Sequence, residues 1–175
     1  MPKVPADLMA RAVGFFRAVY RLHRTEAAVL LVWRDSGFDL VVPAQKVSSV
    51  SVRFDLADGD LPAGSRLVGS MHSHGGFIAY ASSIDEDDEA ELEALHIVVG
   101  DFDRRRLGYS AAIVVDGIRF HLKTGQLERR RRLAEPPDDW LQKVKLAPPP
   151  RPKALIDGVT DIVGGRQPET SARHV

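Results

Sequence analysis

The chain has 175 residues, of which 44% are hydrophobic and 27% charged, and its 24 basic side chains balance its 24 acidic ones. This composition is typical of one globular domain with a short appendage. The zero net charge argues against nucleic-acid binding, and no apolar run approaches the roughly 18 residues of a membrane span. Because the N-terminus also lacks a signal-peptide core, we expect a cytoplasmic protein with no nucleic-acid or membrane partner.

Cysteine is absent from the sequence. Its absence excludes disulfides, thiolate metal sites, cysteine nucleophiles and thioester chemistry of the kind that conjugating enzymes use. Any metal ion must therefore be held by histidine, carboxylate and water.

The first half of the chain predicts one helix followed by several strands. Residues 6–23 repeat apolar side chains at three- and four-residue spacing, which predicts an amphipathic helix packed on the core. Three runs rich in β-forming residues predict a short meander at 26–33, 38–43 and 49–54. After a turn-rich loop, residues 66–74 form a strand apolar enough to lie inside a sheet.

The second half predicts one acidic helix and more strands. Ser82 or Ser83 is suited to cap a helix over about 84–95, whose acidic first turn complements the helix dipole. The acids that follow in this helix, Glu89 among them, are expected on a solvated face. Asp88 lies three residues after Asp85 on the same helix face, so it is a candidate to support Asp85, whose own role is considered below. Three further strands are predicted at 96–101, 109–116 and 118–123. Together the elements predict an α+β domain.

Composition changes near residue 134, where prolines become frequent. We therefore predict a compact domain over 1–133 and a Pro-rich C-terminal tail over 134–175. A short helix within 138–146 is expected to dock on the body through Trp140.

Two histidines stand one residue apart in the strand 66–74. Side chains alternate along a strand, so His72 and His74 project from the same face with α-carbons roughly 6.5–7 Å apart. Both imidazoles can therefore reach one ion at the zinc–nitrogen distance of about 2.0–2.1 Å. A pair of histidines in a strand also occurs in ordinary packing. His96 and His121, each in a separate predicted strand, are expected to be ordinary core or edge residues.

Asp85 is the best candidate for a third ligand, because it begins a helix that the Gly75-Gly76 loop can fold back over the strand end. Two imidazoles and one carboxylate leave one tetrahedral position vacant, as in catalytic zinc sites. Glu26, the acid that leads the apolar strand 26–33, is a candidate general base, although it also suits a solvated strand end. The Ser82 hydroxyl is a candidate to stabilise an oxyanion.

These residues resemble the motif of the JAMM (MPN-plus, or JAB) zinc metalloproteases. The family pattern is an upstream glutamate, then His-x-His, seven residues, serine, two residues and aspartate. Here Glu26 is followed by His72-Ser73-His74, seven residues, Ser82, two residues and Asp85. The resemblance covers about residues 5–125 and is to compact prokaryotic members.

The resemblance implies an MPN/JAB-like fold, with a curved mixed sheet flanked by an N-terminal helix and a central acidic helix, similar to cytidine deaminases. It implies one Zn²⁺ per chain held by His72, His74 and Asp85, with Glu26 as general base and Ser82 as oxyanion stabiliser. The implied activity is that of a deubiquitinase-like isopeptidase, which cuts the bond after a ubiquitin-like modifier in deconjugation or precursor processing. Implied partners are the modifier or its conjugates, and modifier-activating or conjugating enzymes.

The sequence departs from the family at two places. Gly75 replaces the proline that commonly follows the second histidine, and the loop 101–108 is shorter than the substrate-clamping insertions of eukaryotic members. A second protein is therefore expected to help hold the modifier. Two other functions remain open, namely a binding module that recognises a modifier without cutting it and a metallohydrolase of a small peptide or sulfur-carrier conjugate.

Overall fold

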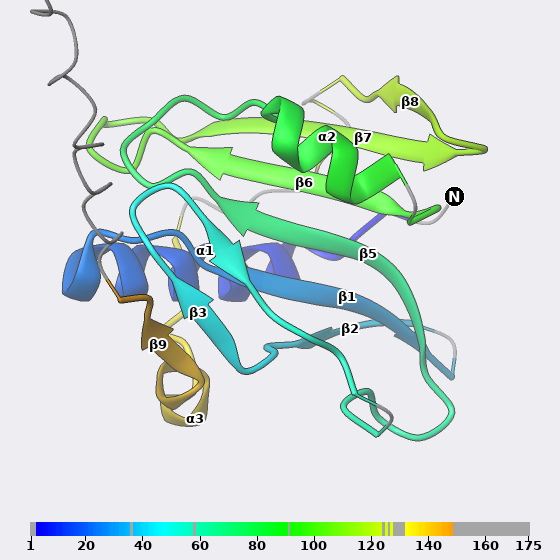
Figure 1. The fold of residues 1–175 in the computed structure, drawn as a ribbon, viewed down its shortest axis with the longest axis horizontal. Helices are drawn as coiled ribbons and strands as arrows, with labels where there is room; N and C mark the ends of the chain where they lie inside the picture. The colour runs from blue at the N-terminus through cyan, green and yellow to red at the C-terminus, as the bar shows by residue number, and fades with distance from the viewer. Residues whose placement is uncertain are drawn as a thin grey trace, which may run out of the picture.

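The structure, a computed structural model, describes residues 3–35, 37–57, 59–90, 92–123, 125, 127 and 132–148. Within these residues one large sheet lies between two helices, with α1 behind it and α2 in front (Figure 1). The helices are α1 (Ala6–His23), α2 (Ser83–Ala90) and α3 (Asp138–Gln142). The strands are β1 (Ala28–Arg34), β2 (Gly37–Val41), β3 (Gln45–Val47), β4 (Val52–Arg53), β5 (Arg66–Ser73), β6 (Leu95–Gly100), β7 (Gly108–Val115), β8 (Ile118–His121) and β9 (Val144–Leu146).

The described strands of the large sheet run in the order β2-β1-β5-β6-β7-β8. β5 and β6 are parallel and every other neighbouring pair is antiparallel, so the sheet is mixed and the predicted α+β class is confirmed. Parallel neighbours need a crossover connection, and here the crossover contains α2. This topology brings the start of α2 back to the C-terminal end of β5.

The main core lies between α1 and one face of the sheet. The apolar side of α1, which includes Phe16 and Val19, packs with Met71 of β5 and Ile97 of β6. Ala28–Val32 of β1 is buried without interruption, as expected of a central strand covered on both faces. The helix predicted over residues 6–23 is confirmed, and it ends at Arg24 in the left-handed conformation.

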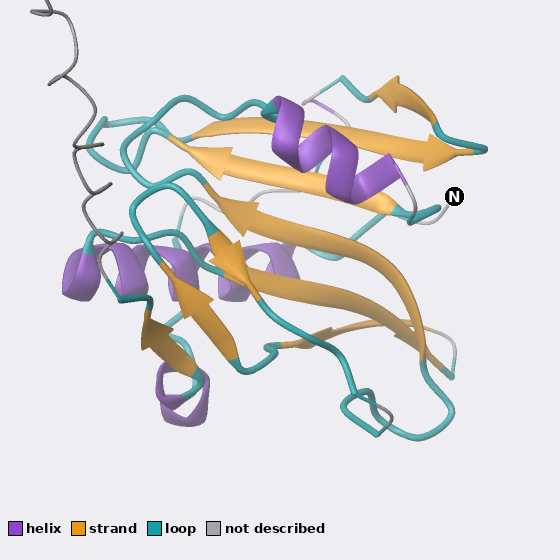
Figure 2. Cartoon of the chain, in the orientation of Figure 1, coloured by secondary structure: helices purple, strands orange, loops and turns teal. Residues whose placement is uncertain are grey.

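A second, three-stranded sheet joins the chain's middle to its later part. Its order is β4-β3-β9, and β9 pairs in parallel with β3 (Figure 2). Trp140 of α3 is buried and meets the ring of Phe15 edge-on, with ring centroids 5.6 Å apart. Part of the predicted tail thus packs on the body. The boundary at 133/134 stays a prediction, and residues 149–175 lie outside the described range.

Two predictions about elements are wrong in detail. The run 49–54 was expected in a meander with β1 and β2, but only Val52–Arg53 is strand, and it pairs with β3. Pro43 has no backbone N–H and follows the end of β2, after which the chain turns into the second sheet. The acidic helix ends at Ala90 rather than near 95, because Leu95 begins β6 and pairs with both Gly69 and Ile113.

Among the described residues, none of the helices has both the length and the apolar character that crossing a membrane requires.

The burial of Trp140 gives a test of the docked segment. Replacing Trp140 by alanine removes a large buried ring, so we expect a loss of about 3 kcal/mol in the free energy of unfolding, measured in urea. Leu146→Ala is the matched control, because that side chain is 59% exposed and should change stability little. Equal, small effects of the two substitutions would contradict the docking.

Candidate metal centre

Three side chains predicted as ligands converge at the C-terminal end of β5. One ligand atom each from His72, His74 and Asp85 lie within 4.8 Å of one another. The Nε2 atoms of the two histidines are 3.4 Å and 3.3 Å from the two Asp85 carboxylate oxygens, respectively. Both imidazoles are almost fully buried and the carboxylate is partly buried. The group is therefore small enough for one ion to contact all three side chains.

The pairing of β5 explains why both histidines share one face. Met71 enters the α1 core, so His72 projects to the opposite face, on which α2 lies. The backbone N–H of His74 donates to the Val99 carbonyl at 2.8 Å, which extends the pairing with β6 past the end of β5. His74 thus keeps the extended alternation, and its ring centroid is 5.2 Å from that of His72.

Asp85 is fixed by a capping box at the start of α2. The Asp85 carboxylate accepts the Ser82 backbone N–H at 2.7 Å, and the Asp85 N–H donates back to the Ser82 hydroxyl oxygen at 3.2 Å. The Ser82 carbonyl accepts the first helical hydrogen bond, from Glu86 N–H. Of the two predicted caps, Ser82 is therefore the one used. Its hydroxyl also donates to Asp85 at 2.6 Å, which fixes the same oxygen further.

The electrostatics of the cluster favour a cation. Burial alone would raise the pKa of Asp85, but the neighbouring imidazoles and the Ser82 hydrogen bond hold that pKa well below its usual range. Burial opposes protonation of His74, yet the Asp85 hydrogen bond and the Glu26 charge outweigh it and raise the pKa of His74. The buried Nε2 of His72 makes no hydrogen bond. A buried imidazole nitrogen that lies 3.4 Å from a carboxylate oxygen without a hydrogen bond fits a metal ligand set.

Glu26 stands beside this cluster without belonging to it. In the antiparallel register of β1 and β5, Ala28 pairs with His72, and continuing it by two residues places Glu26 opposite His74. Its backbone N–H is held by the Ser48 carbonyl at 2.9 Å. The side chain is 7% exposed, and this burial raises the pKa of Glu26 to about 7, although the His74 and His72 charges oppose the rise.

Arg119 on β8 fixes α2 against the sheet, a contact that the local sequence does not reveal. Its guanidinium forms ion pairs with Glu89 and, at 3.8 Å, with Glu86. Glu89 is buried and also lies 3.6 Å from His96, so its predicted place on a solvated face is wrong. His96 is a buried packing residue as expected, hydrogen-bonded through Nδ1 to the Ser70 hydroxyl at 2.9 Å.

The turn after His74 explains the departure from the family pattern at Gly75. Gly75 has a φ of 54°, in the left-handed region that a proline ring forbids. Its carbonyl accepts the Phe102 N–H at 3.0 Å, and the His74 carbonyl accepts the Phe77 N–H at 2.9 Å. Backbone hydrogen bonds therefore hold this turn against the β6–β7 connection.

Other side chains around the centre take different positions. Tyr80 was not predicted as a site residue, but its ring meets the His74 ring edge-on at 5.2 Å and stays half exposed at the mouth of the cluster. Asp88 is exposed, and no contact with Asp85 is found among the described residues. His121 is exposed on β8. Of the predicted basic run 129–132, only Arg132 lies within the described range.

Comparison with known proteins gives structural neighbours but no sequence relatives. No family model matches the sequence, and no curated protein matches it. A Desulfitobacterium hafniense protein with a known solution structure is 14% identical, with a TM-score of 0.50 over 76% of this chain and 95% of its own. A JAB1/MPN domain protein from Archaeoglobus fulgidus is 18% identical, with a TM-score of 0.45 over 70% of this chain and 97% of its own. The first of these likenesses shows a shared fold.

The raised pKa of Glu26 predicts a pH-dependent stability in the metal-free protein. Between about pH 4.5 and 7 the unfolded chain has lost this proton while the native chain keeps it, so native stability falls as the pH rises. Glu26→Gln removes that loss. In EDTA, we expect the variant to match the parent near pH 4.5 and to exceed its unfolding free energy by roughly 3 kcal/mol at pH 8.

Glu135→Gln is the control for this measurement, because Glu135 is exposed. It should follow the parent at both pH values. A stability difference between Glu26→Gln and the parent that is the same at pH 4.5 and pH 8 would contradict the raised pKa.

Proposed function

We propose that this chain is a JAB/MPN-type zinc-dependent peptidase that hydrolyses the bond after a ubiquitin-like modifier. The observation that carries the proposal is the convergence of ligand atoms of His72, His74 and Asp85 within 4.8 Å, including a buried imidazole nitrogen that makes no hydrogen bond. The motif resemblance supports the same assignment, because each of its residues lies in or beside this one cluster.

The ligand set is that of a site with an open position. His72, His74 and Asp85 would hold one Zn²⁺ through two neutral imidazoles and a carboxylate. When bound, the ion would supply Lewis acidity toward the scissile carbonyl and would lower the pKa of a water molecule from 15.7 to about 7.

Glu26 is suited to move the proton in this reaction. Its carboxylate lies near both histidines but outside the three-ligand group, and in the metal-free centre burial raises its pKa to about 7. A base with a pKa near the working pH can both accept a proton from water and return it to a leaving amine. The deprotonated Glu26 takes the water proton, and the protonated Glu26 gives it to the departing lysine or peptide nitrogen.

Ser82 has a structural role that is compatible with a catalytic one. Its hydroxyl hydrogen is donated to Asp85, so it can stabilise an oxyanion only after leaving that carboxylate. Rotation of the hydroxyl away from Asp85 would free this hydrogen, and we propose the oxyanion role for the rotated state.

The substrate class follows from the family resemblance and from the shape of the chain near the centre. The connection between β6 and β7 spans only residues 101–107, so there is no long insertion to clamp a modifier. We propose that the modifier is presented as a conjugate, or with an activating or conjugating enzyme that supplies the missing contacts.

Two variants separate the proposed roles. Glu26→Gln should keep zinc, measured by equilibrium dialysis, yet lose about a hundredfold or more of the cleavage rate of a modifier fused through its C-terminal glycine to a reporter peptide. His72→Ala combined with His74→Ala should lose both zinc and cleavage. In the parent, EDTA should abolish cleavage and added zinc should restore it.

His121→Ala is the matched control, because this histidine is exposed on β8, outside the cluster. It should retain both zinc and activity. Full turnover by Glu26→Gln would contradict the base assignment. Zinc uptake and modifier binding without any cleavage would favour the binding module, and cleavage of short peptides alone would favour a small-substrate hydrolase.

A further inference from the structure

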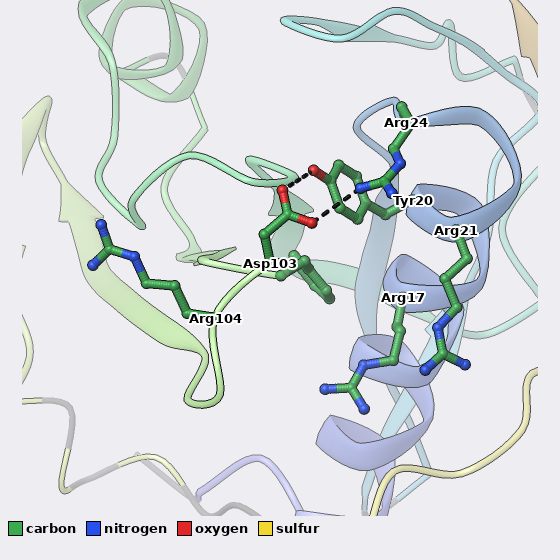
Figure 3. A pocket seen from close by; sticks show the side chains of 7 residues that line it. Arg17, Tyr20, Arg21, Arg24, Asp103 and Arg104 are labelled. Carbon is green, nitrogen blue, oxygen red and sulfur yellow. Dashed lines mark hydrogen bonds and ion pairs between the residues drawn. The ribbon is translucent and has the colours of Figure 1, made fainter.

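A cavity rich in arginine lies at the C-terminal end of α1, outside the metal centre. It has a volume of about 360 Å³ and is lined by Arg17, Tyr20, Arg21, Arg24, Phe102, Asp103 and Arg104 (Figure 3). Four arginines and one carboxylate thus line the cavity. In a chain whose total charge is zero, this is a marked local excess of positive charge.

The single carboxylate in the cavity, Asp103, already has a partner at each oxygen. Asp103 accepts a hydrogen bond from the Tyr20 hydroxyl at 2.6 Å and pairs with the Arg24 guanidinium at 3.0 Å. These contacts lower the pKa of Asp103, so it stays charged. Arg24 is also held over the Tyr20 ring, with its guanidinium carbon 4.8 Å from the ring centroid. Asp103 therefore orders Arg24, and among the described residues it forms no ion pair with Arg17 or Arg21.

Arg17 and Arg21 are the uncompensated charges of this cavity. Within the described part of the chain neither has a hydrogen bond or an ion pair, and both extend from the same side of α1, away from Asp103 (Figure 3). Arg104 points away from them and pairs with Asp101 at 3.2 Å. The helix dipole favours basic residues in the last turn, which accounts for Arg21 but not for Arg17, more than one turn earlier. Like charges four residues apart on a helix repel, so an anion bound between them would relieve a standing repulsion.

The spacing of these arginines matches an extended acidic polypeptide. Four residues of α-helix rise about 6 Å, which sets the separation of Arg17 and Arg21 along α1. Alternate residues of an extended chain project their side chains to one side about 6.5–7 Å apart. Carboxylates at alternate positions of an extended peptide can therefore each meet one guanidinium.

A second cavity extends from this region to the turn that follows His74. It has a volume of about 320 Å³ and shares Tyr20, Arg24 and Asp103 with the first cavity. Its remaining lining is Ser49, Gly75, Gly76 and Phe77, and the last three directly follow the metal-centre residue His74. A polypeptide lying along both cavities would pass from the arginines to the turn beside the cluster.

We propose that Arg17 and Arg21, with Arg24 beside them, form a docking site for an acidic stretch of the polypeptide substrate, on the side of the metal centre where α1 ends. The proposal rests on the proposed function only in calling the bound chain a substrate. The docking itself needs neither metal nor catalysis. Bidentate guanidinium–carboxylate hydrogen bonds would hold the acidic side chains.

A binding experiment in EDTA tests the docking separately from catalysis. The probe is a fluorescently labelled peptide of six glutamates, and binding is followed by anisotropy at low and physiological ionic strength. The parent should bind it, more weakly at the higher salt concentration, whereas Arg17→Gln with Arg21→Gln should weaken binding by about tenfold or more. His72→Ala with His74→Ala should leave this binding unchanged, because neither histidine lines the arginine cavity.

A matched control distinguishes binding at Arg17 and Arg21 from a general effect of the net charge. Arg53→Gln with Arg66→Gln removes the same charge from exposed arginines outside both cavities and should bind the glutamate peptide within about twofold of the parent. An equal loss in both double variants would overturn the proposal. Equal affinity for a six-glutamine peptide would also overturn it. So would binding of tripolyphosphate, but not of the glutamate peptide, through Arg17 and Arg21.

Discussion

The position of the Asp85 carboxylate is the constraint on which the candidate centre depends. Asp85 belongs to α2 while the histidines belong to β5 and its immediate extension, so their meeting depends on how the crossover returns to the sheet. The capping box with Ser82 fixes the carboxylate at the first turn of α2, and Arg119 fixes α2 itself through Glu86 and Glu89. A local hydrogen-bonding motif and a long-range ion pair together place one anionic oxygen beside each imidazole.

The fold supplies the rest of the centre through strand register. The antiparallel pairing of β1 and β5 places Glu26 opposite His74, and the same pairing buries Glu26 at the end of the sheet. Burial raises the pKa of this carboxylate beside the histidines. The same desolvation disfavours its charge in the absence of a cation, so a divalent ion nearby would stabilise both Glu26 and the neighbouring Asp85. The cluster is therefore electrostatically incomplete as protein alone.

Local sequence patterns predict the elements that carry the centre, and non-local contacts explain what they miss. The period of apolar residues in 6–23 and the alternation around His72 and His74 each depend on near neighbours, so they can be predicted from the sequence. The pairing of β3 with β9 joins residues about a hundred positions apart, and the ion pair between Arg119 and Glu89 joins residues 30 positions apart. No local pattern contains that information, which is why Glu89 was expected in solvent. The cavity of Arg17 and Arg21 also depends on Phe102 and Asp103, which only the fold brings to α1.

Zinc K-edge X-ray absorption on the purified chain, loaded with one equivalent of zinc, reports directly on the proposed ligands. We expect a four-coordinate ion with two imidazole nitrogens and oxygen ligands at about 2.0–2.1 Å, and loss of the imidazole signal when His72 and His74 are replaced by alanine. A chain that takes up no zinc, or an ion in an all-oxygen shell that is unchanged by those replacements, would contradict the proposed ligand set.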